Sequence, residues 1–245
     1  MKYIYITFLL FFIGCSSSLP DESLPLADHL KIGMDFLDQG KFVKAQDEFK
    51  FILSRGTGTD YGDDAQFFLA EAYFLNEQYM LSIQEYENLT RKMAFSPFFE
   101  KARFRICEAY RIESPNYYND QSYTEKALER YREFLDDFPE SEHSRTVSES
   151  MRVLRNKLAK KLYETGILYM KMDEFEPARM SFNQVLDLYY DTDIIERVHY
   201  EVIRSYLKQG NDKKARSHWI NKGRDSIKQE KLVLELTEVF SQKEL

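Results

Sequence analysis

Aromatic residues recur along the 245-residue chain at a nearly constant interval. Phe36 is followed at the same spacing by Tyr73 and Tyr110, and the spacing returns between Tyr169 and Tyr206. Three of the four separations are 37 residues, and the one between Tyr110 and Tyr169 is 59 residues. A fixed interval of this size is typical of chains made of stacked copies of one supersecondary unit. The interval therefore predicts a repeat array, in which each unit contacts only its neighbours.

Small residues accompany the aromatic residues at fixed offsets. Three positions before each aromatic residue the chain carries, in order, Gly33, Ala70, Cys107, Gly166 and Ile203, the last being bulkier than the pattern prefers. In the second half of each unit a small residue is followed four positions later by an aromatic one, and these pairs are Ala45 and Phe49, Ser82 and Tyr86, Ala127 and Tyr131, Ala178 and Phe182, and Ala215 and Trp219. A spacing of four puts both members on one helical face. The pattern therefore predicts helical hairpins in which aromatic side chains fill the space left by small residues of the partner helix.

This pattern resembles the tetratricopeptide repeat, a helical hairpin of about 34 residues. The resemblance implies an all-α fold, a tetratricopeptide-repeat solenoid of about five helical hairpins with a C-terminal capping helix. Repeats are expected near residues 26–62, 63–99, 100–140, 142–195 and 196–232, with the C-terminal helix continuing to residue 245. Glycines agree with these boundaries: Gly40 and Gly210 fall inside hairpins, and Gly56, Gly58 and Gly223 follow second helices, where a left-handed residue is common.

The interval of 59 residues marks an interruption of the repeat. Tyr110 and Ala127 are 17 residues apart, against nine in the other units, which predicts a turn lengthened by eight residues around 114–123. Another 14 residues precede Tyr169, a length of about four helical turns. That segment keeps apolar residues at a spacing of three to four: Val147, Met151, Leu154, Leu158 and Leu162. We expect one long helix there, or two abutting helices.

The N-terminal segment predicts export and lipid attachment. An apolar run from Tyr3 to Ile13, too short to span a bilayer, follows Lys2 and is typical of a secretory signal. The residues FIGC, ending at Cys15, resemble the lipobox of bacterial lipoproteins, and Ser16 favours the outer membrane. We expect a lipoprotein signal peptide at 1–14, a lipidated tether at 15–25, and a tetratricopeptide-repeat domain at 26–245. The alternative is an ordinary signal peptide that happens to contain a cysteine.

Composition and missing motifs argue against several classes of function. With 41 acidic and 34 basic residues the net charge is −7, which disfavours nucleic acid as a partner. Once Cys15 carries lipid, Cys107 has no cysteine left to pair with, and its place in the small-residue series predicts a buried, inert thiol. No catalytic elbow or phosphate-binding loop is present, and the histidines are scattered, so we expect no enzyme activity, no cofactor and no metal. These histidines are His29, His143, His199 and His218.

From about Cys15 to residue 222 the chain resembles one family of lipoproteins, and the most specific part of this resemblance lies between residues 127 and 190. The residues FPESEHS resemble the YPxSxY block of the BamD family, and NKLAK resembles its RLA block, with His143 and Lys157 as departures. The lipobox, the five repeats and the enlarged third turn agree with this family. The resemblance implies a non-catalytic periplasmic scaffold of the β-barrel assembly machine, anchored by lipid in the outer membrane. The implied partners are a POTRA domain of BamA, other lipoproteins of the machine if present, and unfolded outer-membrane proteins.

The positions of residues within the repeats nominate candidates for these contacts. Grooves of helical repeats bind peptide segments of partners. Peptide-binding candidates in the N-terminal repeats are Leu30, Met34, Leu37, Phe67, Glu71, Phe74, Phe104 and Arg111. The BamA-contact candidates in the C-terminal repeats are Arg204 and Lys208. The alternative for the N-terminal candidates is that they pack against the next hairpin or the tether, and for the C-terminal candidates that the terminal helix merely covers the last repeat.

Two further groups of residues, and the function itself, leave alternatives open. Tyr117, Tyr118 and Tyr123 in the enlarged turn form a contact patch or fold back onto their own hairpin. A basic group meets lipid headgroups or an acidic partner, or forms a solvated helix face; its members are Arg152, Arg155, Lys157, Lys160 and Lys161. The competing functions are those of a pilotin-like or other cell-envelope adaptor, and glycan capture resembling SusD, although the long insertions of that family are missing.

Overall fold

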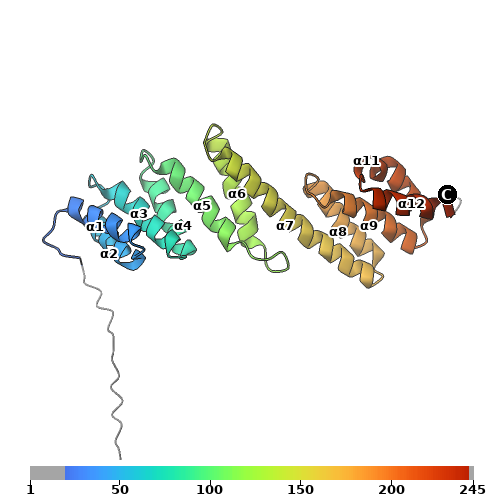
Figure 1. The fold of residues 1–245 in the computed structure, drawn as a ribbon, viewed down its shortest axis with the longest axis horizontal. Helices are drawn as coiled ribbons and strands as arrows, with labels where there is room; N and C mark the ends of the chain where they lie inside the picture. The colour runs from blue at the N-terminus through green and yellow to red at the C-terminus, as the bar shows by residue number, and fades with distance from the viewer. Residues whose placement is uncertain (1–19, 243–245) are drawn as a thin grey trace, which may run out of the picture. The chain divides into compact units, whose positions relative to one another are not determined.

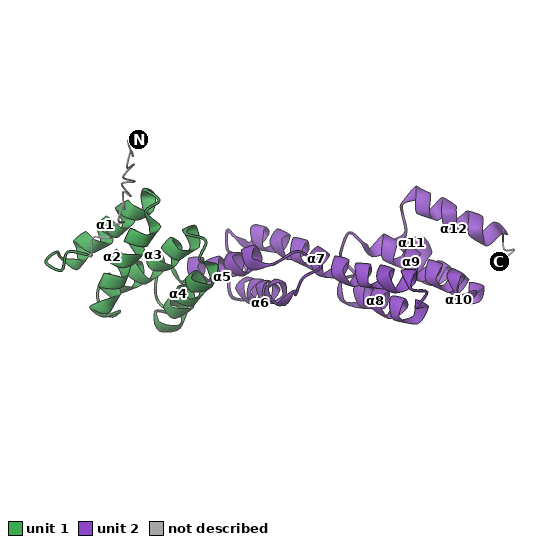
Figure 2. Cartoon of the chain, turned by 90° about the horizontal axis from the view of Figure 1, so that it is seen from below, with its two compact units in different colours: residues 1–99 green, residues 100–245 purple. Residues whose placement is uncertain are grey.

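The computed structural model describes residues 20–242 of the chain. Cys15, the signal peptide expected at 1–14 and residues 243–245 of the expected C-terminal helix lie outside the described residues. Every regular element within residues 20–242 is a helix (Figure 1). The expected all-α fold of tetratricopeptide-repeat hairpins is confirmed. The chain divides into two compact units, residues 1–99 and 100–245 (Figure 2).

The N-terminal unit contains four helices arranged as two hairpins. They are α1 (Leu26–Asp38), α2 (Phe42–Ser54), α3 (Gly62–Leu75) and α4 (Tyr79–Lys92). Each helix packs against the next one along the chain. The turns that close the two hairpins therefore lie at the same end of the unit, which we call the closed end. A 3.2 Å hydrogen bond from the Gln46 amide of α2 to the Gln78 side chain of the second turn joins the hairpins there.

The core of the N-terminal unit contains the predicted pair Ala45 and Phe49, and the predicted pair Ser82 and Tyr86 is also buried. The buried members of this core are Ala45, Phe49, Ile52, Ala65, Leu69, Ala72 and Tyr73. A Cβ atom on Gly33 of α1 would lie only 2.6 Å from the Phe49 ring of α2. Because any side chain at Gly33 would overlap this ring, glycine is what lets α1 and α2 cross so closely.

The C-terminal unit contains the remaining helices. They are α5 (Phe99–Glu113), α6 (Ser122–Asp137), α7 (Ser144–Lys171), α8 (Phe175–Leu188), α9 (Ile195–Lys208), α10 (Asp212–His218), α11 (Arg224–Ser226) and α12 (Glu230–Gln242). A single π-helical turn, Trp219–Gly223, joins α10 to α11. The pairing seen in the first unit recurs here, since Ala127, Tyr131, Ala178 and Phe182 are fully buried. Gly166 of α7 faces the Phe182 ring of α8, as Gly33 faces Phe49.

The interruption of the repeat is a single long helix. α7 has 28 residues, and it packs on α6 as well as on α8. Its apolar positions Val147, Leu154 and Leu158 are buried, as the spacing of three to four residues predicted. The lengthened turn lies between α5 and α6. One continuous helix therefore spans two hairpins of the unit.

The C-terminal helix covers the last hairpin. Leu236 and Phe240 of α12 are buried together with Ile203, Ala215 and Ile227. The Glu196 carboxylate of α9 accepts hydrogen bonds of 3.0 and 2.9 Å from the backbone amides of Lys228 and Gln229, just before α12. These amides precede a helix N-terminus, where unpaired donors need an acceptor. α12 is therefore a capping helix, as expected.

The glycine expectations are partly confirmed and partly wrong. Gly40, Gly56 and Gly210 have φ values of +70°, +123° and +76° and so lie in the left-handed region. Gly58 and Gly223 do not adopt a positive φ. A Cβ atom on Gly223 would lie 3.1 Å from both Ile203 and Trp219. Gly223 is therefore required for close packing inside the helix and not for ending it.

Candidate protein-binding surfaces

The candidate side chains of α1 differ in their exposure. Leu30 and Leu37 are half-buried and pack against the core of the N-terminal unit. Met34, between them, has 39% of its surface exposed. Met34 is therefore the member of this group with an apolar surface open to a partner.

The candidates of α3 make contacts inside the N-terminal unit. Phe67 is 1% exposed and stacks on Phe98, with 4.4 Å between ring centroids. The buried Glu71 carboxylate accepts a 2.5 Å hydrogen bond from the Tyr86 hydroxyl of α4. The half-buried Phe74 ring meets Tyr79 edge to face at 5.3 Å. In this structure the three side chains of α3 thus pack within the repeats, which is the alternative that the sequence left open. A contact between them and a peptide stays a prediction.

The candidates of α5 are also engaged within their own unit. Phe104 stacks face to face on His143, with 4.0 Å between ring centroids. Arg111 forms an ion pair with Glu108, with 2.7 Å between its Nη2 and the Glu108 Oε2. Glu108 also accepts a hydrogen bond from the Tyr131 hydroxyl of α6. This repeats the contact between Glu71 and Tyr86 one repeat later.

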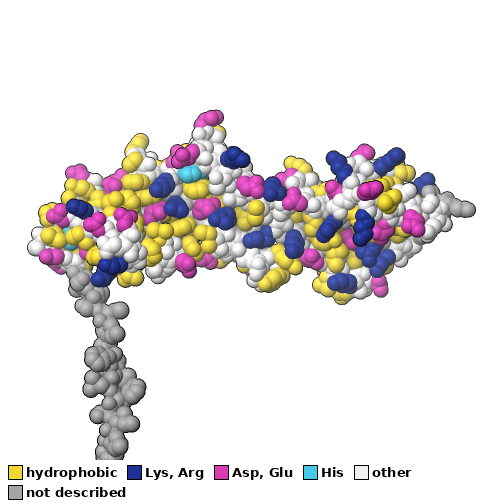
Figure 3. Space-filling view, viewed as in Figure 1, with side chains coloured by type: hydrophobic (Ala, Val, Ile, Leu, Met, Phe, Trp, Pro, Cys, Tyr) yellow, Lys and Arg dark blue, Asp and Glu magenta, His cyan; other side chains and the backbone are white. Residues whose placement is uncertain are grey.

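An exposed apolar group at the closed end of the N-terminal unit was not among the candidates. We call it the closed-end patch, and its exposed side chains are Val43 (58%), Leu75 (44%), Met80 (44%) and Leu81 (43%). Figure 3 shows hydrophobic side chains gathered over the N-terminal unit. In the sequence, the closed-end patch could have been found from the apolar residues beside the two hairpin turns, where polar residues are usual. The repeat pattern did not predict the patch, because that pattern identifies buried positions.

The candidates Arg204 and Lys208 lie on a basic stripe of α9. With Arg197 they are spaced by seven and four residues, which places all three on one helical face. All three are exposed, and we call them the α9 stripe. The Arg204 Nη1 lies 3.0 Å from Glu201 Oε1, and Glu201 is buried beneath the stripe. Burial raises the pKa of the Glu201 carboxyl, while Arg204 acts in the opposite direction.

The helices from α8 to α12 carry as many acidic as basic side chains. Figure 3 shows Lys and Arg side chains interspersed with Asp and Glu over this part of the C-terminal unit. α12 borders this surface through the Tyr200 hydroxyl of α9, which donates to the Glu235 carboxylate. An arginine that pairs with one carboxylate keeps further N–H donors for a second acceptor. The α9 stripe is therefore suited to an acidic partner.

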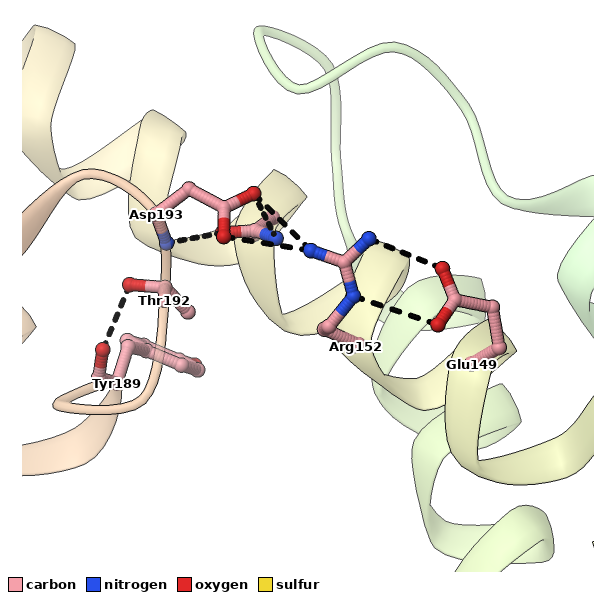
Figure 4. Close-up of polar contacts among 6 residues, drawn as sticks. Glu149, Arg152, Tyr189, Thr192 and Asp193 are labelled. Atoms are coloured by element: carbon pink, nitrogen blue, oxygen red, sulfur yellow. Dashed lines mark hydrogen bonds and ion pairs between the residues drawn. The ribbon is translucent and has the colours of Figure 1, made fainter. Parts of the chain in front are cut away.

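The basic residues of α7 bind loops of their own unit. Arg152 lies between Glu149 of α7 and Asp193 of the α8–α9 loop, at 2.9 and 3.1 Å (Figure 4). Arg155 binds the Asp191 carboxylate at 2.5 Å in the same loop. Arg152 is exposed and Arg155 is half-buried, and a contact of the basic group with lipid headgroups or with an acidic partner stays a prediction. Arg152 and Arg155 are connectors between α7 and the α8–α9 loop.

The enlarged turn folds back mainly onto its own unit. Tyr123 stacks on Tyr110 of α5, with 6.2 Å between ring centroids. Lys160 of α7 lies over the half-buried Tyr117 ring, 4.4 Å from its centroid. Tyr118 is 67% exposed. Of the three tyrosines, Tyr118 alone offers most of its surface to a partner.

The described residues contain a single cysteine, and it is buried. Cys107 is 1% exposed, and burial raises the pKa of its thiol to about 12, so it stays protonated at neutral pH. Between residues 20 and 242 there is no cluster of three or more His, Cys, Asp or Glu side chains that is arranged to hold a metal ion. None of the helices in that range is long and apolar enough to cross a membrane.

Comparisons with known proteins identify a family. The family model described as YfiO, outer membrane lipoprotein, matches residues 26–220. The outer membrane protein assembly factor BamD of Rickettsia prowazekii (strain Madrid E) is 25% identical over 214 residues, covering 84% of this chain and 82% of that protein. BamD of Caulobacter vibrioides is 22% identical over 210 residues, covering 83% of this chain and 68% of that protein. Among solved structures, a thermophilic tetratricopeptide-repeat protein of Thermus thermophilus is 17% identical with a TM-score of 0.38, covering 87% of this chain and 98% of that one.

Proposed function

Because the chain belongs to the YfiO family of outer membrane lipoproteins, we propose that it is a non-catalytic scaffold of the β-barrel assembly machine. The observation that carries this proposal is the family match, which extends over 26–220 and so over nearly all of the repeats. Both relatives described above are named outer membrane protein assembly factors. The scaffold binds BamA and unfolded outer-membrane proteins and so promotes their insertion into the outer membrane.

The scaffold is held at the periplasmic side of the outer membrane by lipid on Cys15. The lipobox-like residues at 12–15 and the family description support this location. Two or more acyl chains are enough for stable anchoring, since each buried methylene contributes about 0.8 kcal/mol. No helix of the repeats then has to enter the bilayer.

The POTRA domain of BamA binds the α9 stripe. Arg204 and Lys208 are exposed, point from the same helical face and carry charge that an acidic surface would neutralise. Charges of this kind steer association and select the partner more than they add affinity. Other lipoproteins of the machine, if present, bind elsewhere on the scaffold.

The N-terminal unit binds segments of unfolded outer-membrane proteins. Met34 and the closed-end patch expose apolar side chains there, and exposed apolar patches are typical of protein-binding surfaces. Phe67, Glu71 and Phe74 support this surface from inside the hairpin and set the positions of α3 and α4.

Affinity purification of the tagged protein from native membranes tests the proposal. BamA is expected among the co-purified proteins. A secretin in its place would indicate a pilotin-like adaptor, and a TonB-dependent sugar transporter would indicate glycan capture. Either result, without BamA, would overturn the proposed function.

Charge reversal on the α9 stripe tests the contact itself. The double variant Arg204→Glu and Lys208→Glu is expected to lose most of the co-purified BamA while remaining in the outer membrane fraction. Lys213→Glu is the matched control, because Lys213 is an exposed lysine of the neighbouring helix α10. Equal recovery of BamA with the double variant and the control would refute a contact at this stripe.

A further inference from the structure

A groove runs beside α7 in the C-terminal unit, between the start of α6 and the end of α8. It has a volume of about 400 Å³. Its apolar surface comes from Leu158, Leu162, Leu188 and Tyr189, and acidic side chains on one side are Asp120 and Glu125. We call these six residues the α7 groove. The groove lies where the extra length of α7 separates α6 from α8, so it is a product of the interruption in the repeat.

One wall of the α7 groove is fixed by lysines of α7. Lys157 donates hydrogen bonds to the Ser114 carbonyl at 3.2 Å and to the Ser114 hydroxyl at 2.7 Å. Lys161 donates to the Asn119 carbonyl at 2.8 Å. These contacts attach the enlarged α5–α6 turn to the middle of α7. Asp120 lies at the end of this turn and Glu125 in the first turn of α6, so these contacts hold the acidic side of the groove in one position.

The opposite wall is fixed by the loop after α8. Arg155 donates to the Leu188 carbonyl at 2.9 Å as well as to Asp191. Asn156 donates to the Asp193 carboxylate at 3.0 Å and accepts from its backbone amide at 2.9 Å. The groove is therefore formed before any partner arrives. A site that is already formed loses little conformational entropy on binding.

The chemistry of the α7 groove defines its occupant. Leu188 is 58% exposed, while Leu158 is 7% exposed and forms part of the floor. Asp120 and Glu125 form no ion pair within residues 20–242. Hydrogen bonds from Ser122 lower the pKa of Asp120, so this carboxylate is charged at neutral pH. Lys161 also borders the groove: its ammonium donates to the Asn119 carbonyl, and its charge helps to lower the pKa of Asp120.

We propose that the α7 groove binds a short segment of a partner protein in which a leucine or phenylalanine is flanked by lysine or arginine. The apolar side chain packs on Leu158, Leu162 and Leu188. The flanking cations neutralise Asp120 and Glu125. The groove is separate from the α9 stripe and from the closed-end patch, so this contact adds a third binding surface to the proposed scaffold.

Three fluorescein-labelled peptides of equal length test the inference. The first alternates leucine with lysine, the second leucine with glutamate, and the third serine with lysine. Fluorescence anisotropy with the full chain solubilised from membranes measures each dissociation constant. The leucine–lysine peptide is expected to have a much lower dissociation constant than the other two, because it alone has both the apolar and the basic groups.

Variants at the groove assign the binding to it. Leu188→Ser is expected to weaken the leucine–lysine peptide about tenfold, the effect of losing one buried apolar side chain. Glu125→Lys is expected to weaken it as well and to improve binding of the leucine–glutamate peptide. Leu234→Ser is the matched control, since Leu234 of α12 is 62% exposed and lies outside the groove.

The inference is wrong if the leucine–lysine peptide binds Leu188→Ser and Leu234→Ser with the same affinity. It is also wrong if the three peptides bind equally, or if none binds at millimolar concentration. Circular dichroism of each variant checks that the helices are intact. None of these outcomes depends on whether BamA co-purifies, so a failure here is distinguishable from a failure of the proposed function.

Discussion

At the scale of single residues, the contact between a small residue and an aromatic ring is what holds each hairpin together. Gly33 and Gly166 leave room for Phe49 and Phe182, and the sequence spacing predicted both pairs. The fifth repeat reverses the arrangement. Ile203 occupies the position where the pattern prefers a small residue, and the small residue is instead Gly223 on the opposite side of the contact. The repeat spacing does not predict this exchange of large and small residues.

The histidine pair of the last hairpin predicts a loss of stability in acid. The His199 Nδ1 and His218 Nε2 lie 3.1 Å apart. Burial is the main cause that lowers the pKa of both imidazoles, and the positive charge of Lys222 acts in the same direction. The pKa of His218 is lowered from 6.5 to about 4. Their neutral forms therefore stabilise the fold fully above pH 6.5. As pH falls from 6.5 towards 4, the unfolded chain takes up protons first and this stability is lost.

The variant His218→Gln is expected to reduce the difference in unfolding midpoint between pH 7 and pH 5. Thermal unfolding followed by circular dichroism measures it. Lys222→Met is expected to act in the same direction, because it removes a positive charge that disfavours protonation. Lys228→Met is the control, since Lys228 is exposed and contacts the fold through its backbone amide. An unchanged pH dependence in His218→Gln would contradict the prediction.

Most of the candidate site residues could not be placed by repeat position alone. Phe67 and Glu71 occupy surface positions of the general pattern, but here Phe98 covers one and Tyr86 binds the other. Both partners come from segments outside the helix that carries the candidates. A periodicity counted along one helix does not contain this information. Arg204 differs because its neighbours on α9 already indicate an exposed basic face.

At the scale of elements, all the hairpin turns except the enlarged α5–α6 turn share one backbone conformation with different residues. Gly40, Glu77, Asp173 and Gly210 all have a positive φ, between 58° and 76°. The sequence predicted this conformation only at Gly40 and Gly210, where the residue is glycine. Glu77 and Asp173 adopt it with a side chain, at a cost of about 1–2 kcal/mol per residue. Packing of the flanking helices must impose the turn in those two hairpins.

Glu77→Gly is expected to stabilise the N-terminal unit by up to about 1 kcal/mol, because glycine adopts a positive φ without the steric cost. Chemical denaturation measures the change in the free energy of unfolding. Gly40→Ala is the reverse test and should destabilise the unit, although no atom lies within 4 Å of the added methyl group. Glu87→Gly, inside α4, should also be destabilising. A Glu77→Gly variant less stable than the wild type would show that the Glu77 side chain contributes more than its backbone costs.

The long helix α7 was expected from its apolar spacing, but the connections it makes were not. Lys157, Lys161 and Arg155 look like an ordinary solvated face in the sequence, since charged residues on helices usually are. In the fold they reach backbone carbonyls and carboxylates of two separate loops. Such partners lie 33 to 43 residues away along the chain, beyond the reach of any local pattern.

At the scale of the whole molecule, repeat packing predicts that damage stays local. Each hairpin contacts only its neighbours, so the stability of the array is close to a sum of nearest-neighbour contributions. Trp219, the only tryptophan, stacks on Phe240 at 6.5 Å in the C-terminal unit. Its fluorescence therefore reports on the last hairpin and its cap, while circular dichroism reports on all helices.

Gly33→Ala and Gly166→Ala are expected to separate these two signals. Each forces a methyl group onto an aromatic ring, which costs about 1–3 kcal/mol. Gly166→Ala weakens the α7–α8 hairpin, which packs directly on α9 of the last hairpin, and so should lower the unfolding midpoint measured by Trp219 fluorescence. Gly33→Ala should lower chiefly the part of the circular dichroism transition that belongs to the N-terminal unit. Gly58→Ala, where no atom lies within 4 Å of the added methyl group, is the control. Equal shifts of the Trp219 midpoint in both variants would mean that the chain unfolds as one cooperative block.

The burial of the Cys107 thiol affects how the chain can fold after synthesis. A sulfur atom that remains protonated at neutral pH and is closed off from solvent neither attacks a disulfide nor joins two copies of the protein. In the proposed lipoprotein, where lipid occupies Cys15, folding of the described helices requires no disulfide bond. The hairpins can then assemble equally well in a reducing or an oxidising compartment, and oxidoreductase catalysts of protein folding have no substrate here.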